Sequence, residues 1–270
     1  MEFEEKVATK SGDEFKKIFN IDGLELLVFA GDGSLTMATT NTLDGKSKAS
    51  HMVKLDTEVL NSLYFKRELL EKTRHWMVSL LYFGDIIKTH NFHNSLPYNF
   101  VEEASKVIRN PLEVLAGNGE GTLLADALFA SGELVKNFLV EKAIHSDTKK
   151  RKGTIFAWTD GRENSTKYGQ TLPVESINEY LNSPELKGKV QVATIFFGED
   201  ADISPLYQVS SKLSERQLKR LSNLKITHHL QPPGDRACLN GVCHGTLTSE
   251  KSEVIRRFIF ELSNTPPTKE

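Results

Sequence analysis

Cysteine is scarce in this sequence, with two residues in 270. A small secreted scaffold built on disulfides is therefore excluded. Long apolar runs are also missing, because segments 24–30 and 76–83 fall well short of the roughly 18–20 residues that a membrane-spanning helix needs. The opening residues, Met-Glu-Phe-Glu-Glu, lack the positive region and apolar stretch of a signal peptide. We therefore expect a cytoplasmic or otherwise intracellular protein without a membrane span.

The sequence has no excess of either charge. It contains 34 basic and 36 acidic residues, which gives a net charge of −2. Nothing at this level favours binding to a phosphate backbone, so nucleic acid is not the expected partner. Apolar residues make up 39% and charged residues 26%, an ordinary globular composition. A chain of this length can bury a sizeable core, so the fold does not need a metal for its stability.

Buried strands and amphipathic helices alternate along the chain. The longer apolar runs predict strands at 24–30, 76–83, 154–158 and 190–197. Apolar residues at helical spacing predict helices over 53–70, 101–108, 121–142, 177–181, 205–221 and 254–262. Weaker patterns suggest strands at 86–92 and 224–230 and a loop at 37–50. This order predicts an α/β fold of three layers, with a doubly wound, mostly parallel central sheet flanked by helices.

The chain shows no low-complexity linker and no internal repeat. One domain over residues 23–263 is the simplest interpretation. An N-terminal extension would then occupy residues 1–22. Residues 264–270, which include two prolines, would form a flexible tail.

Oxygen-bearing side chains gather where the predicted strands end. Ligands of doubly wound sheets bind outside the carboxyl ends of the strands, so these positions are the ones to inspect. The candidate ligands, all predicted on this face, are Asp32, Ser34, Thr36, Thr122 and Asp160. Carboxylates and hydroxyls suit a hard cation, Mg²⁺ first and Mn²⁺ or Ca²⁺ as alternatives. An open coordination position would accept a Glu or Asp carboxylate from a partner protein.

Three segments resemble the motifs of von Willebrand factor A domains. Segment 26–37 (LLVFAGDGSLTM) resembles the first strand and the DxSxS motif of that family. Segment 121–128 (GTLLADAL) is similar to the second motif, in which a threonine opens a helix. Segment 154–164 (TIFAWTDGREN) looks like the third, a strand that ends in Thr-Asp-Gly, and 190–207 is similar to the strand and loop that follow. The motifs occur in the family's order along nearly the whole chain.

The resemblance implies a metal-ion-dependent adhesion site (MIDAS). Ser34 and Thr36 would ligate the metal directly, and Thr122 would do so directly or through water. Asp32 and Asp160 would act mainly through water and hydrogen bonds. Thr36 departs from the family because serine is usual there, and the added methyl group can crowd the site. Segment 37–52 is also longer than usual, as an elaborated loop at the binding face would be.

Other functions remain open at this level. Each motif alone is explained by turn or capping chemistry, and only their co-occurrence favours a metal. Asp32-Gly33-Ser34-Leu35-Thr36 also resembles the DxDxT motif of phosphatases that use an aspartate nucleophile, so a magnesium-dependent hydrolase with Asp32 as nucleophile is one alternative. Ser34 then stands where a general acid is needed. A domain that binds its partner without metal is another. The absence of an evident nucleophile and base favours a binding module over an enzyme.

A second group of polar residues lies near the C-terminus. It consists of His228, His229, Cys238, Cys243 and His244. The spacing Cys-x4-Cys-His is not a standard zinc pattern. Ordinary loop residues, a disulfide or redox-active pair, and a second, soft-metal site are the three interpretations. The loop should lie on the same face as the first site.

Overall fold

A computed structural model describes residues 24–38, 45–69, 75–93, 96–116, 121–142, 148–160, 172–196, 204–223, 242–244 and 249–264. The strands form one seven-stranded sheet in the order β3-β2-β1-β5-β6-β7, and β4 pairs with β2 beside this path. Their bounds are β1 Leu24–Asp32, β2 His75–Phe83, β3 Ile87–Thr89, β4 Asn99–Phe100, β5 Lys152–Thr159, β6 Val190–Phe196 and β7 Val242–His244.

The centre of the sheet is parallel. β1 lies between β2 and β5, β6 follows β5, and all of these pairs are parallel, as is β6 with β7. Only the short strands β3 and β4 pair antiparallel, both with β2. Asp32 pairs with Phe83, and Gly31 pairs with Trp158. The carboxyl ends of β1, β2 and β5 therefore lie side by side at one edge, as the sequence predicts.

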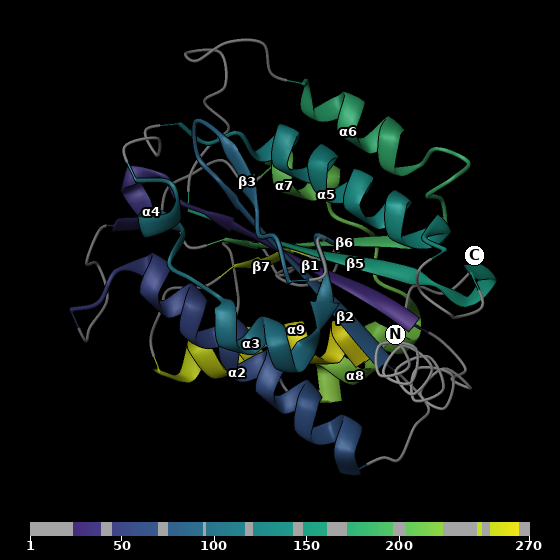
Figure 1. Cartoon of the computed structure of the whole chain (residues 1–270), viewed down its shortest axis with the longest axis horizontal. Helices are drawn as coiled ribbons and strands as arrows, with labels where there is room; N and C mark the ends of the chain where they lie inside the picture. Colours follow the sequence, from purple (N-terminus) through teal and green to yellow (C-terminus); the bar gives the residue numbers. More distant parts are fainter. Residues whose placement is uncertain are drawn as a thin grey trace, which may run out of the picture.

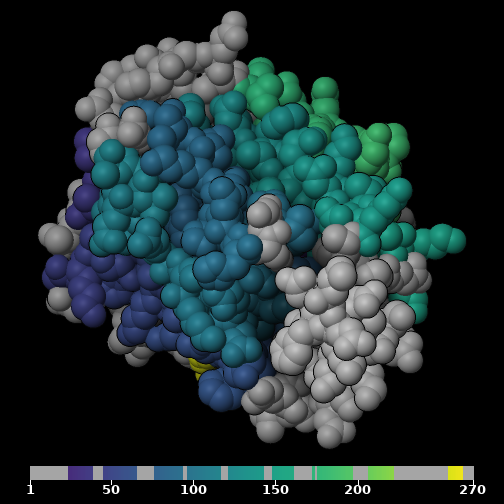
Figure 2. All heavy atoms as spheres, in the orientation of Figure 1, coloured from purple at the N-terminus to yellow at the C-terminus, as the bar shows by residue number. Residues whose placement is uncertain are grey.

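Helices cover both faces of the sheet (Figure 1). One layer contains α5 Leu124–Val140, α6 Val174–Leu181 and α7 Ser204–Val209. The other contains α2 Lys48–Leu69, α3 Val101–Val107, α8 Glu215–Asn223 and α9 Ser249–Asn264. The short helices are η1 Leu35–Ala38, α4 Pro111–Val114 and η2 Thr148–Lys150. In the space-filling view, atoms of α5, α6 and the segment from β2 to α4 form one continuous surface (Figure 2).

Strand β1 shows why the sheet needs both layers. Leu27 and Phe29 pack into the core under α2 and α9, whereas Leu26, Val28 and Ala30 pack into the core under α5. Side chains alternate between the faces of a strand, so a strand that is buried at every position, as β1 is, must be covered on both sides. The predicted fold class, an α/β sheet of three layers, is confirmed.

One predicted helix is wrong in its extent. Segment 205–221 was expected to form a single helix, but α7 ends at Val209 and α8 begins at Glu215. The chain turns back to the sheet between them, where the Ser211 N–H donates to the Val192 carbonyl and the Ser211 hydroxyl accepts from the Val192 N–H. A local break of this kind is favoured by serines, which bond readily to nearby backbone groups.

The remaining differences concern short or peripheral elements. The sequence patterns missed β4, β7 and α4, and the predicted strand 86–92 shrinks to β3. The predicted loop 37–50 includes the end of η1 and the start of α2. Predicted strand 224–230, the extension 1–22 and tail residues 265–270 lie outside the described residues. Within the part of the chain that is described, no helix is both long and apolar enough to cross a membrane.

Candidate metal centre

The turn after β1 creates the base of the site. The Gly33 N–H donates to the Phe83 carbonyl at 2.7 Å, which keeps the turn against the end of β2. A Cβ at Gly33 would lie 2.6 Å from Leu115 Cδ1 and 3.0 Å from the Pro111 carbonyl oxygen. Only glycine allows α4 to approach so closely. The next N–H, that of Ser34, donates to Asp32 Oδ1 at 2.7 Å and orients the carboxylate.

Asp32 lies fully buried between two hydrogen-bond donors. Its Oδ1 accepts from Ser34, and its Oδ2 accepts from the Thr159 hydroxyl at 2.7 Å. Burial raises the pKa of Asp32 to about 7, although the hydrogen bonds from Ser34 and Thr159 oppose this shift; the nearby Asp160 carboxylate adds to it. The negative charge of Asp32 is thus costly where it stands, and a nearby cation would stabilise it.

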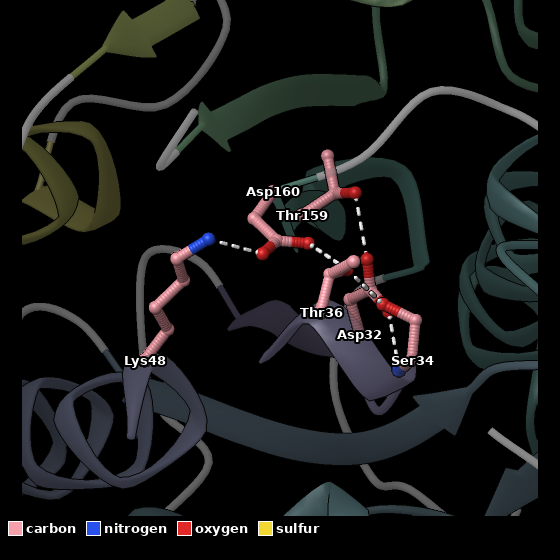
Figure 3. A network of polar contacts seen from close by, with 6 residues as sticks. All are labelled: Asp32, Ser34, Thr36, Lys48, Thr159 and Asp160. Atoms are coloured by element: carbon pink, nitrogen blue, oxygen red, sulfur yellow. Dashed lines mark hydrogen bonds and ion pairs between the residues drawn. The ribbon is translucent and has the colours of Figure 1, made fainter. Parts of the chain in front are cut away.

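A chain of hydroxyls joins Asp32 to the second carboxylate. The Ser34 and Thr36 hydroxyls are hydrogen bonded at 3.1 Å, and Thr36 donates to Asp160 Oδ1 at 2.7 Å. The side chains converge from β1, η1 and the end of β5, as Figure 3 shows. The structure therefore brings together four of the five predicted ligands. Thr36 and Asp160, which are hydrogen bonded to each other, are 124 positions apart in the sequence.

Thr122, the fifth predicted ligand, lies buried just before α5. The N–H of the following residue, Leu123, donates to the Gly84 carbonyl directly after β2. Since Gly33 is bonded to the neighbouring Phe83, Thr122 lies on the same edge of the sheet as the Asp32–Ser34 turn. It does not serve as the N-cap of α5, a position taken by Leu123.

Lys48 was not singled out by sequence analysis. Its Nζ lies 2.5 Å from Asp160 Oδ2, and its side chain is 14% exposed whereas that of Asp160 is fully buried. Lys48 is the first residue of α2 and lies within segment 37–50, for which the sequence predicts a loop.

Thr159 was also missed as a positioning residue, since a threonine at a strand end gives no signal distinct from strand propensity.

The residues present fit a hard divalent cation. Among the described residues no three His, Cys, Asp or Glu side chains form a metal-binding group, so the centre depends on hydroxyls beside two carboxylates. The donors are all oxygen, the type that Mg²⁺, Mn²⁺ and Ca²⁺ prefer. A fully buried carboxylate whose pKa is raised by burial gives such an ion a clear electrostatic role.

The second predicted cluster is only partly described. His228, His229 and Cys238 lie outside the described residues. Cys243 and His244 belong to β7, where they pair with Ile195 and Phe196 of β6. β7 runs parallel to β6, and its backbone ends at the same edge of the sheet as the metal centre. The three interpretations of this group, as loop residues, a disulfide or redox-active pair, or a soft-metal site, stay predictions.

In sequence, the chain matches no family model and no curated protein. In structure it is similar to several solved proteins. Proximal thread matrix protein 1 from the mussel byssus aligns with a TM-score of 0.53 at 17% identity, over 88% of this chain and 47% of that one. A second structure of that protein, described as having a zinc-occupied MIDAS motif, gives 0.53 at 16% identity over 88% and 48%.

Two bacterial structures extend the likeness. A von Willebrand factor type A protein from Catenulispora acidiphila aligns with a TM-score of 0.50 at 10% identity, over 88% of this chain and 42% of that one. BatB from Bacteroides thetaiotaomicron gives 0.50 at 11% identity, over 90% and 100%. The chain spans about half the length of the mussel protein. Its fold is that of von Willebrand factor A domains.

Proposed function

We propose that this chain is a protein-binding module that depends on a divalent metal ion, with Mg²⁺ as the first choice and Mn²⁺ or Ca²⁺ as alternatives. The observation that carries the proposal is the hydrogen-bonded network of Asp32, Ser34, Thr36 and Asp160 at the carboxyl edge of the sheet. Ser34, Thr36 and Thr122 would hold the ion with their hydroxyls. Asp32 and Asp160 would balance its charge and orient the hydroxyls. The zinc-occupied MIDAS motif of the mussel protein supports this assignment.

The bound ion would leave a position for an oxygen ligand from outside the chain. We expect a Glu or Asp side chain of another protein to fill it, because carboxylate oxygens are among the ligands that these hard cations prefer. The surface beside the site supports a protein partner. Leu35, between the two hydroxyl residues of the first motif, is 62% exposed. This exposed apolar side chain would give a partner protein a contact directly beside the ion.

The same geometry disfavours the phosphatase alternative. Both oxygens of Asp32 accept hydrogen bonds, and the residue has no exposed surface. A carboxylate that attacks phosphorus needs a free, accessible oxygen. Ser34, in the position of the general acid, is itself tied to Thr36. The site is built to hold and orient oxygens rather than to release one for attack.

Metal binding is tested by titrating the purified chain with Mn²⁺ in a calorimeter, followed by competition with Mg²⁺ and Ca²⁺. We expect saturable binding with one ion per chain. Ser34→Ala should weaken binding at least tenfold, since the loss of even an outer-shell partner costs about 10–100-fold. Lys54→Ala is the matched control, because Lys54 is exposed on α2 and pairs only at the surface. Folded protein that binds none of the three ions would contradict the proposal.

Partner binding is tested by a pull-down from a matched extract with Mg²⁺ or with chelator. The wild type should retain a protein that is lost in chelator and with Ser34→Ala, and kept with Lys54→Ala. A partner retained equally under all conditions would instead favour binding without metal. Substituting Glu and Asp residues of the captured protein then identifies the ligand carboxylate.

A further inference from the structure

Lys48 brings a positive charge to the predicted metal centre. Its ammonium group contacts Asp160 Oδ2 while Thr36 donates to Asp160 Oδ1, so both oxygens of this buried carboxylate are engaged. Figure 3 shows the lysine side chain reaching from the start of α2 toward Asp160. The first turn of that helix is fixed by buried Ala49 and Met52, which pack in the core under the sheet. The fold therefore places this lysine beside the site.

The position of Lys48 on its helix is unfavourable without Asp160. The N-terminus of a helix carries partial positive charge, which favours acidic residues and disfavours lysine. The first turn of α2 contains no acidic residue. With its side chain 14% exposed, Lys48 also loses part of its hydration. The ion pair with Asp160, whose side chain is fully buried, offsets these costs. Removing either partner would leave the other charge without its partner in a largely buried place.

A divalent ion and the ammonium group would compete for the same carboxylate. Two like charges a few ångströms apart repel each other, and partly buried surroundings weaken this repulsion less than bulk water does. For the ion to be held by Ser34 and Thr36 with help from Asp160, Lys48 must release Asp160 or tolerate that repulsion. In either case the lysine lowers the affinity for metal.

We propose that Lys48 is an internal cation that competes with the divalent ion for Asp160 and thereby sets the metal affinity of the site. This inference rests on the proposed function, since it concerns the same centre. Lys48 acts as a positioning and regulatory residue and not as a ligand. It keeps Asp160 oriented and paired when the metal is scarce, and metal binding requires that this pair be opened.

The test compares Mn²⁺ binding by Lys48→Met with that of the wild type. Methionine keeps the length and much of the packing of lysine but removes the charge. We expect Lys48→Met to bind Mn²⁺ about tenfold or more tightly, as expected when a unit charge close to a divalent ion is removed. Lys48→Arg keeps the charge and should stay close to the wild type. Lys54→Met, on the exposed face of the same helix, should have no effect.

Thermal melting supplies a second readout. In chelator, Lys48→Met should melt below the wild type because Asp160 loses its partner. Added Mn²⁺ should raise its melting temperature by more than it raises that of the wild type, in proportion to the tighter binding. If Lys48→Met does not fold in chelator, Lys48→Gln replaces it, because the glutamine amide still donates a hydrogen bond to Asp160.

The outcomes separate this inference from the proposed function. If Lys48→Met and the wild type bind Mn²⁺ equally, or if the variant binds more weakly, the competition is wrong and the metal-binding function stands. If only the neutral variants bind Mn²⁺, the competition is supported in its strongest form, because the lysine then takes the place of the metal. The metal dependence proposed for the wild-type chain is wrong in that case. If neither the wild type nor any neutral variant binds Mn²⁺, Mg²⁺ or Ca²⁺, both the inference and the proposed function are wrong.

Discussion

Thr159, the last residue of β5, donates a hydrogen bond of 2.7 Å to Oδ2 of Asp32, the last residue of β1. Both residues are fully buried, and the bond joins two adjacent parallel strands at the edge where the proposed metal centre lies. The carboxylate has no surface through which water could replace this donor. Its orientation therefore depends on Thr159 and on the N–H of Ser34.

Thr159→Val should lower both stability and metal affinity. Valine matches threonine in shape but leaves Oδ2 of a buried carboxylate without its donor, which costs about 1–3 kcal/mol. Urea denaturation measures the loss of unfolding free energy, and calorimetry with Mn²⁺ measures affinity. Thr159→Ser keeps the hydroxyl and should bind metal like the wild type. Equal Mn²⁺ affinity in the Val and Ser variants would show that the hydroxyl does not orient Asp32.

Substitutions of Thr36 test whether its hydroxyl ligates the metal ion directly. The resemblance to von Willebrand factor A motifs marks Thr36 as a departure from the serine that is usual there, and the structure shows its hydroxyl between Ser34 and Asp160. Thr36→Val should weaken Mn²⁺ binding by about tenfold or more, at least as much as the loss of an outer-shell partner. Thr36→Ser should bind as well as the wild type or better, because the methyl group is gone. Unchanged Mn²⁺ affinity in Thr36→Val would remove this residue from the site.

The positions of Asp32 and Asp160 can be predicted from the sequence because each lies at the end of a strand with a strong local signal. A mostly apolar strand such as β1 is easily recognised, and its carboxyl end fixes where Asp32 lies. β5 gives the same signal before Asp160. Parallel pairing then brings both ends to one edge. Little beyond the order of the strands is needed for this step.

Lys48 shows what such reasoning misses. Its contact with Asp160 spans 112 positions, and the segment before it resembles a polar loop. A lysine that begins a helix usually faces solvent, so only tertiary packing reveals its partner. The break between α7 and α8 was missed for a related reason. It depends on bonds between Ser211 and Val192 of another element, whereas the local pattern continues as a helix.

Substitution of Leu35 tests whether the partner protein binds to the surface beside the proposed metal centre. Leu35 is 62% exposed, next to the predicted ligand residues Ser34 and Thr36. Leu35→Ser should raise the Kd for the captured partner about fivefold or more, equivalent to about 1 kcal/mol, while Mn²⁺ binding and melting temperature stay unchanged.

The matched control for this surface is Phe65→Ser. Phe65 is 61% exposed, but it lies about 25 Å from Lys48 along α2, at the opposite end of the helix. It should therefore leave partner binding intact. Equal losses from Leu35→Ser and Phe65→Ser would place the interface elsewhere or point to a general effect of exposed apolar residues.

The buried carboxyl of Asp56, which lies outside the proposed metal centre, should make the stability of the protein depend on pH. It lies buried on α2, and its Oδ1 has no hydrogen-bond partner. Burial raises the pKa of its carboxyl well above the usual value, and the neighbouring Trp158 side chain offsets this only in part. The folded protein therefore keeps a proton on Asp56 in a range where the unfolded chain releases it. Ionisation stabilises the unfolded chain, so this residue lowers stability as pH rises above the ordinary aspartate pKa.

Asp56→Asn removes that penalty because asparagine does not ionise. The variant should be more stable than the wild type at pH 7, and the difference should vanish near about pH 4, where the carboxyl is protonated in both states. Urea denaturation across this pH range, in chelator, measures it. Glu58→Gln, on a partly exposed position of the same helix, should change little, since surface charges contribute weakly. A gain in Asp56→Asn that is the same at every pH would mean that packing, and not ionisation, accounts for it.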